Sequence, residues 1–265
     1  MTLAAEAWSE ERVELFGGQV HLLKGGQGDP LVVLPRDNGY PGWQPFHSIL
    51  AERFTVYVPS HPGYHNSDPP AWSWLANVRD LAIVHRLLLG TLGLESVTLL
   101  GLGFGGWLAA EMATMDQRPF KSLVLVGPMG IQPAEGEIFD QFLVNTETYA
   151  RASYHDEANF EAVYGAEPEF EYLEHWESDR EMTSRIGWKP YMYNLTLPGL
   201  LGGVSVPTLV VWGRQDRIVP MECGRLYADA LPNARLEVLE ACGHAVDIEK
   251  PNELAKLVLT FTKTL

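Results

Sequence analysis

Short apolar runs alternate with amphipathic stretches along most of the chain. The apolar runs have the length and β-branched content of buried strands, and the stretches between them carry the periodicity of helices. The expected strands are residues 13–16, 19–24, 31–34, 55–58, 97–102, 123–126, 207–213 and 235–239. The expected helices are residues 43–53 and 75–94, one beginning at Trp107 and one beginning at Asn252. This alternation predicts an α/β fold with a mostly parallel, eight-stranded sheet flanked by helices.

One segment, from about Met129 to Leu201, breaks this alternation. It holds 14 acidic residues against four basic ones, is rich in aromatic residues and has no strand pattern. We therefore expect a helical cap inserted after the sixth strand. The expected domains are a core of residues 1–130 and 202–265 and a cap of residues 131–201. Its acidic residues are expected to form a solvated face, and its aromatic residues to pack on the core or to line an apolar pocket.

Composition limits the classes of function. The chain has 265 residues, 46% of them hydrophobic, which suffices for one α/β core with an insertion. Its net charge of −15 argues against nucleic-acid binding, which needs a basic surface. Residues 1–11 lack the pattern of a signal peptide, and no apolar stretch approaches the roughly 20 residues of a membrane span. We expect a cytoplasmic protein without a membrane partner, in which Cys223 and Cys242 are buried free thiols, with a disulfide as the alternative.

A glycine-rich turn follows the expected strand 97–102. Gly101, Gly103 and Gly106 fit the Gly-x-Gly-x-x-Gly pattern of dinucleotide sites, but the next strand ends without the acid that such sites use. The turn also has the shape of a nucleophile elbow, in which Gly-x-Ser-x-Gly raises a serine between a strand and a helix. Gly103 stands at the serine position and has no atom that attacks a carbonyl. A purely structural turn is the remaining alternative, since glycine relieves the strain of a positive φ.

Two further loops carry residues suited to acid–base chemistry. Asp216 lies three residues after Gly213, which ends an expected strand, and His244 follows the last expected strand. In a parallel sheet both loops lie at the carboxyl ends of strands, on the same edge as the glycine turn. Asp216 can then accept from one ring nitrogen of His244 and leave the other nitrogen free as a base. Either residue alone is more often structural, but their order and spacing predict a dyad.

The order of these motifs resembles that of the α/β-hydrolase superfamily over essentially the whole chain. The resemblance rests on residues 101–105, 213–220 and 243–244, on the helix start at 249–254, and on residues 59–68, which match the family's Pro-Gly-x-Gly-x-Ser-Asp loop. It implies a serine nucleophile, a histidine base, an aspartate that orients the histidine, and an oxyanion hole of two backbone amides. By position, these amides are those of Phe104 and of Arg36 or Asp37.

The chain departs from the family pattern at three places. Gly103 replaces the serine, and residues 34–39 replace the usual His-Gly followed by a small residue. His65 occupies the second glycine position of the Pro-Gly-x-Gly loop. Because the oxyanion turn is altered together with the nucleophile, the pattern favours natural divergence. An engineered, nucleophile-less variant of a serine hydrolase is the alternative.

Two functions fit these observations. The first is a hydrolase or lyase that acts on a small apolar carbonyl substrate without a covalent intermediate. His244, oriented by Asp216, would activate a water held in the space of the missing hydroxymethyl group or would move a proton. Arg36 and the backbone amides would stabilise an oxyanion. The second is a non-catalytic pseudo-hydrolase that binds a ligand or a partner. The retained acid–histidine pair favours the enzyme.

The sequence leaves the substrate and the oligomeric state open, with a homo-oligomer as one option. A small-molecule ligand is expected, without a cofactor or metal ion. The candidate pocket residues are His65, Trp107, Trp188 and Tyr191.

Overall fold

The computed structural model describes residues 8–39, 41–64 and 66–265, and its centre is an eight-stranded sheet. The strands are β1 (Ser9–Leu15), β2 (Gly18–Gly25), β3 (Asp29–Leu34), β4 (Phe54–Pro59), β5 (Val97–Leu102), β6 (Phe120–Val126), β7 (Thr208–Gly213) and β8 (Ala234–Leu239). Their order in the sheet is β1-β2-β4-β3-β5-β6-β7-β8. β2 runs antiparallel to β1 and to β4, and the other neighbours are parallel. The predicted fold class is confirmed.

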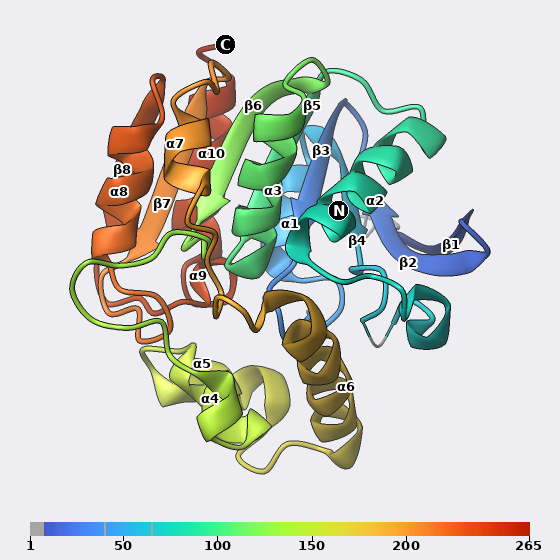
Figure 1. The fold of residues 1–265 in the computed structure, drawn as a ribbon, viewed down its shortest axis with the longest axis vertical. Coiled ribbons are helices and arrows are strands. Elements are labelled where there is room, and N and C mark those ends of the chain that lie inside the picture. Colours follow the sequence, from blue (N-terminus) through green and yellow to red (C-terminus); the bar gives the residue numbers. More distant parts are fainter. Residues whose placement is uncertain (1–7, 40, 65) are drawn as a thin grey trace, which may run out of the picture.

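Helices cover both faces of the sheet (Figure 1). α2 (Val78–Thr91), α3 (Phe104–Met115) and α8 (Glu222–Ala230) pack on one face. α1 (Pro45–Ala51), the short α9 (Val246–Glu249) and α10 (Pro251–Thr262) pack on the other. Neighbouring residues of β5 belong to different cores, Leu99 to the first and Leu100 to the second. This double coverage explains why β5 is buried at every position and reads as one apolar run.

Residues 131–201, called the insertion below, lie between β6 and β7. Its elements are η2 (Gln141–Leu143), α4 (Thr146–Ala152), α5 (Glu157–Tyr164), α6 (Phe170–Gly187) and α7 (Leu197–Leu201). Figure 1 shows α4, α5 and α6 beyond the carboxyl ends of the parallel strands. Tyr154, Phe160, Tyr164 and Trp176 form a buried aromatic cluster that includes Ala245, the residue after His244. The division of the chain into a core and a cap stays a prediction.

Two helices begin at residues other than those that the sequence pattern predicted. α2 begins at Val78 rather than at residue 75, because the side chain of Asn77 accepts a hydrogen bond from the backbone N–H of Asp80 and caps the helix. α3 begins at Phe104 rather than at Trp107. Two glycines in the first turn of α3 weaken its helical signal, since glycine has a low helix propensity. Packing of this turn against the sheet outweighs that propensity.

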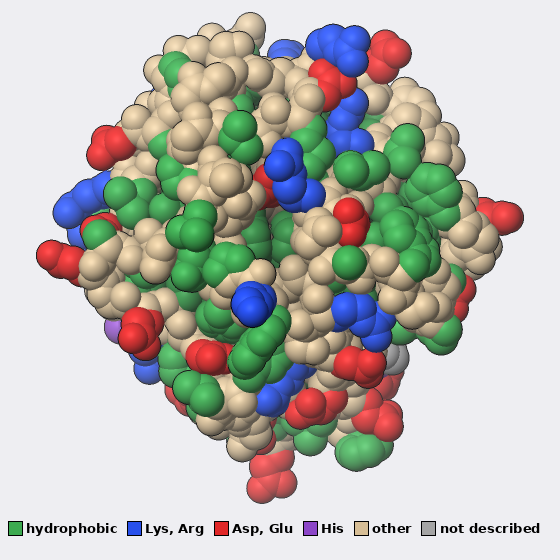
Figure 2. All heavy atoms as spheres, in the orientation of Figure 1, with side chains coloured by type: hydrophobic (Ala, Val, Ile, Leu, Met, Phe, Trp, Pro, Cys, Tyr) green, Lys and Arg blue, Asp and Glu red, His purple; other side chains and the backbone are tan. Residues whose placement is uncertain are grey.

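The surface carries much of the chain's negative charge. On the face in Figure 2, acidic side chains gather along the lower margin, where Figure 1 places the insertion. The insertion also exposes large apolar side chains, including Leu143 and Phe170. Within the described part of the chain, every helix is too short or too polar to cross a lipid bilayer.

Candidate active site

The turn between β5 and α3 holds Gly103 in a backbone conformation that favours glycine, with a φ of 51° and a ψ of −112°. The neighbouring glycines allow close backbone contacts. A Cβ on Gly105 would lie 2.2 Å from the carbonyl oxygen of Leu34, and a Cβ on Gly101 would lie 2.2 Å from the carbonyl oxygen of Gly105. The first turn of α3 therefore lies directly against the end of β3.

Asp216 is fixed by its own loop after β7. Its Oδ1 accepts hydrogen bonds from the backbone N–H groups of Ile218 and Val219, at 2.8 and 2.9 Å. Its Oδ2 lies 2.8 Å from Nδ1 of His244, and both side chains are buried. An ionised carboxylate only accepts hydrogen bonds, so Nδ1 carries the proton. Nε2 of the neutral imidazole then keeps its lone pair.

His244 lies directly over Gly103. Its Nε2 is buried and has no hydrogen-bond partner among the described residues. A Cβ built on Gly103 would lie only 2.6 Å from this nitrogen. The imidazole comes this close because glycine has no side chain to hold it away. The imidazole therefore occupies part of the space above Gly103, and the water expected there stays a prediction that requires the ring to move.

Arg36, in the loop after β3, forms a buried ion pair with Asp247. Burial by itself lowers the pKa of Arg36, but the charge and hydrogen bond of Asp247 outweigh burial and raise the pKa above its ordinary value. The stem of Arg36 passes over the turn, with Cγ 3.1 Å from the Cβ position of Gly103. The guanidinium is therefore already paired with Asp247, and the expected role of Arg36 in stabilising an oxyanion stays a prediction.

Asp37 is a third buried carboxylate and connects the loop after β3 to the insertion. Its Oδ2 accepts hydrogen bonds from Nε2 of Gln141 at 2.9 Å and from the hydroxyl of Tyr149 at 2.8 Å. Burial raises the pKa of Asp37, and the hydrogen bond from Tyr149 acts in the opposite direction. Two hydrogen bonds therefore join the buried Asp37 to the insertion.

The side chains of Asp37, Gln141, Tyr149 and Asp247 had no role in the sequence-based site. Gln141 and Tyr149 come from the insertion, more than 100 residues from Asp37 in the chain. No local pattern relates residues at that separation. The one available signal was Asp247 itself, an acid three residues after His244, which lies in the short helix α9. Its burial and its pairing with Arg36 emerge only in the folded chain.

Two of the candidate pocket residues, Trp107 and Tyr191, line different pockets. The indole N–H of Trp107 donates to Glu111, and both line a pocket beside α2 and α3. Tyr191 lines a different pocket and donates its hydroxyl proton to a backbone carbonyl of the insertion. Trp188 is 54% exposed. The rings of Trp188 and Tyr191 both pack against the ring of Phe142, with centroid distances of 5.2 and 5.8 Å. His65 lies outside the described residues.

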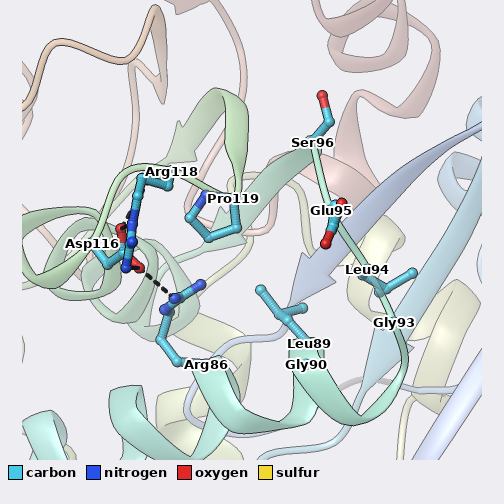
Figure 3. A pocket seen from close by; sticks show the side chains of 10 residues that line it. All are labelled: Arg86, Leu89, Gly90, Gly93, Leu94, Glu95, Ser96, Asp116, Arg118 and Pro119. Atoms are coloured by element: carbon cyan, nitrogen blue, oxygen red, sulfur yellow. Dashed lines mark hydrogen bonds and ion pairs between the residues drawn. The ribbon is translucent and has the colours of Figure 1, made fainter.

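A pocket of about 530 Å³ lies at the ends of the parallel strands that are opposite to Asp216 and His244. Arg86, Asp116 and Arg118 line it, and both arginines pair with the carboxylate of Asp116 (Figure 3). The pocket includes residues that immediately precede β5 and β6, so it lies at the amino ends of these strands. The loops of Asp216 and His244 follow the carboxyl ends of β7 and β8. In the described ranges, no group of three His, Cys, Asp or Glu side chains is arranged to hold a metal ion.

Comparison with known proteins identifies the family. Residues 31–257 match the model of the alpha/beta hydrolase family. The chain belongs to this family. The resemblance inferred from the motifs is thereby confirmed at the level of the family and the fold.

Curated relatives of this α/β hydrolase are hydrolases of bacteria. A 2-hydroxy-6-oxononadienedioate/2-hydroxy-6-oxononatrienedioate hydrolase of Pseudomonas putida is 29% identical, covering 92% of this chain and 91% of the relative. A 2-hydroxy-6-oxo-6-phenylhexa-2,4-dienoate hydrolase of Burkholderia cepacia is 25% identical, over 92% and 91% of the two chains.

Solved structures share the fold of this α/β hydrolase. A 2-hydroxy-6-oxo-6-phenylhexa-2,4-dienoate hydrolase from Rhodococcus sp. strain RHA1 superposes with a TM-score of 0.80 at 20% identity, over 97% of this chain and 99% of that one. A bacterial membrane phospholipase A superposes with a TM-score of 0.83 at 20% identity, over 97% and 86% of the two chains.

Proposed function

We propose that this chain is a hydrolase in which His244 and Asp216 act on a small carbonyl compound without a covalent intermediate. One observation carries the proposal. Nδ1 of His244 is bound to a buried carboxylate, and its Nε2 is buried without a hydrogen-bond partner among the described residues. A buried polar atom without a partner is costly, and a catalytic role is one reason for which a protein keeps such an atom. The hydrolase names of the curated relatives support the reaction class.

The proposed reaction needs only water and the imidazole. Nε2 removes a proton from a water as its oxygen adds to the substrate carbonyl, and the same proton then goes to the leaving group as the carbon–leaving-group bond breaks. Gly103 has no side-chain atom that could form an acyl-enzyme. The proposal is that residue 103 occupies the nucleophile position of the elbow and that this chain has no nucleophile there. The backbone amide of Phe104, with that of Arg36 or Asp37, would bind the developing oxyanion.

Access to Nε2 requires movement. Because the nitrogen is buried, we infer that the insertion acts as a cap over a core of residues 1–130 and 202–265. The hydrogen bonds of Asp37 to Gln141 and Tyr149 join the two parts beside His244. Substrate entry would break these contacts before water and substrate reach the imidazole.

The charges at the site favour a neutral substrate. Asp37, Asp216 and Asp247 are buried there, and the guanidinium of Arg36 is already paired. A substrate carboxylate would enter a field that is negative on balance. The relatives are named for substrates that carry carboxylates. Because of the negative field, we propose that this chain differs from those relatives and acts on a small, apolar, uncharged carbonyl compound.

The test is a screen for conversion by mass change with three carbonyl classes (esters, lactones and β-diketones) and with epoxides, which have no carbonyl group. Wild type and His244→Ala are compared in parallel, with His175→Ala on α6 as the matched control. We expect His244→Ala to lower turnover by roughly 10²–10⁴-fold and His175→Ala to leave it unchanged. Asp216→Asn should also lower turnover, because the imidazole loses its orientation and tautomer. A conversion that survives His244→Ala unchanged would contradict the mechanism.

A non-catalytic ligand-binding protein is the second candidate. The close approach of His244 to Gly103 favours it, since the imidazole closes the space in which a water would attack. A binding protein would convert none of the compounds. Its His244→Ala and Asp216→Asn variants would change only ligand affinity or melting temperature.

A further inference from the structure

A pocket of about 190 Å³ lies between the start of α2, the outer side of α3 and the chain that follows α6. Its lining residues are Asn77, Val78, Arg79, Trp107, Glu111, Ile186, Lys189, Pro190, Tyr193 and Asn194. Gly103, Asp216 and His244 are not among them. The pocket is smaller than the roughly 300–1,000 Å³ typical of sites for drug-sized ligands, so it suits a small molecule.

Glu111 is a fully buried carboxylate in the wall of this pocket. Its Oε1 accepts hydrogen bonds from the indole N–H of Trp107 at 3.1 Å and from Nδ2 of Asn194 at 2.7 Å. Its Oε2 has no hydrogen-bond partner among the described residues. The nearest cation is Nε of Arg79, at 3.6 Å, which is beyond hydrogen-bond length. One oxygen of a buried charge therefore lacks a donor.

Two cationic side chains line the same pocket. Arg79 lies in the first turn of α2, and its side chain is 48% exposed, so it is free to turn. Lys189 is exposed and forms no ion pair with a carboxylate in the described part of the chain. The wall therefore combines a buried acceptor that lacks a donor with two movable cations. Its single carboxylate leaves the lining with an excess of positive charge.

We propose that this pocket binds a small zwitterion of the amino-acid class, with its ammonium group on Oε2 of Glu111 and its carboxylate on Arg79 and Lys189. An ammonium group supplies the donor that Oε2 lacks, and a charge-assisted hydrogen bond is stronger than the long contact it replaces. The guanidinium of Arg79 then turns from Glu111 to the ligand carboxylate. Val78, Ile186 and Pro190 supply an apolar wall for a hydrophobic side chain.

The three ligand groups can be tested separately by isothermal titration calorimetry of the full chain. The probes are leucine, leucinamide, which lacks the carboxylate, and N-acetylleucine, which lacks the ammonium group. We expect leucine to bind and each blocked compound to bind at least about tenfold more weakly. Inorganic phosphate serves as the test of a simple anion site.

Glu111→Gln is the decisive variant. Glutamine retains an acceptor for Trp107 and Asn194 but removes the charge, so leucine binding should fall at least about tenfold while the circular dichroism spectrum stays unchanged. Lys189→Met should weaken leucine but not leucinamide. Arg118→Gln, in the distant pocket of Figure 3, is the matched control and should bind leucine like wild type.

Several outcomes would overturn the proposal. One is the absence of leucine binding to folded wild type at about 1 mM. Others are equal binding of leucine and leucinamide, which would indicate a cation site, or equal binding of N-acetylleucine or phosphate, which would indicate an anion site. If Glu111→Gln does not fold, the binding measurements with Lys189→Met, leucinamide and N-acetylleucine still decide whether the pocket binds a zwitterion. The proposal does not depend on the chemistry proposed for His244, because binding is measured without turnover.

Discussion

At residue 103, two separate constraints favour glycine. The first is the backbone, whose φ of 51° and ψ of −112° are costly for any residue with a Cβ. The second is space, because a Cβ would lie 2.6 Å from Nε2 of His244 and 3.1 Å from Cγ of Arg36. A side chain at this position must therefore move the imidazole as well as accept the strained backbone.

A comparison of Gly103→Ala with Gly103→Ser separates the effects of backbone strain and limited space from the effect of adding a nucleophile. Both variants add a Cβ, so each should lose about 1–3 kcal/mol of unfolding free energy, measured by urea denaturation. Only the serine carries a nucleophile. We expect an activated ester to add one acyl group to Gly103→Ser, detected by intact-protein mass, and none to Gly103→Ala. A folded serine variant that is never acylated would mean that the loop after β3 offers no oxyanion donors.

The ion pair of Arg36 and Asp247 gives a second prediction at this scale. Removing one partner leaves an uncompensated buried charge, so Asp247→Asn should cost about 3–5 kcal/mol of unfolding free energy. The double variant Arg36→Met and Asp247→Leu removes both charges and should recover most of this loss. Urea denaturation of the three proteins measures both effects. Equal stability of Asp247→Asn and wild type would contradict the pairing.

At the scale of elements, two buried histidines join three parts of the core. His61 follows β4, and its Nε2 lies 2.9 Å from the carbonyl oxygen of Pro35 in the loop after β3. Its Nδ1 lies 2.9 Å from Nε2 of His85 on α2. The carbonyl only accepts, so Nε2 of His61 donates to it, and Nδ1 accepts from His85. With a donor at Nε2 and an acceptor at Nδ1, the ring of His61 is neutral.

Stability should therefore depend on pH. Burial lowers the pKa of His61 to about 4 and the pKa of His85 well below its ordinary value. The unfolded chain then binds more protons than the native chain below about pH 6.5, so unfolding free energy is full above that pH and falls toward pH 4. Urea denaturation at about pH 7 and about pH 5 measures the loss.

A double variant, His61→Leu and His85→Leu, tests the source of this dependence. Its stability should fall less between the two pH values, although it is less stable at both because Pro35 loses a donor. Some dependence should remain, since burial also lowers the pKa of His47 to about 4. If the double variant loses as much unfolding free energy between the two pH values as wild type, groups other than His61 and His85 cause the acid sensitivity.

At the scale of the whole molecule, the net charge of −15 opposes compactness. Added NaCl screens this repulsion, so the melting temperature should rise between about 0.01 M and about 0.15 M salt. Glu167, Glu169 and Glu174 are exposed residues of the insertion. Changing these three residues to glutamine should reduce the rise. Calorimetry at each salt concentration measures it, and a melting temperature that falls with salt would show that attractive ion pairs dominate.

Much of the fold was predictable because its signals are local. β5 was expected at residues 97–102 and lies at Val97–Leu102, since burial on both faces makes every position apolar. The start of α2 was missed by three residues, because the cap at Asn77 competes with the apolar pattern. The motif order also indicated that Asp216 and His244 come from loops at one edge of the sheet. The meeting of Trp107, Trp188 and Tyr191 in one pocket stays a prediction, since Trp107 and Tyr191 line two different pockets of the described structure.

The sequence by itself determined the alternation of strands and helices, the place of the insertion and the order of the glycine turn, Asp216 and His244. Each of these follows from burial periodicity or backbone chemistry within a few neighbouring residues. Only the tertiary structure decided that the imidazole of His244 lies in the space over Gly103 and that Asp247 forms an ion pair with Arg36. It also decided that the insertion donates hydrogen bonds to Asp37. The reason is physical: a buried charge must find its partner among whatever side chains folding brings within a few ångströms, and those come from segments far apart in the chain.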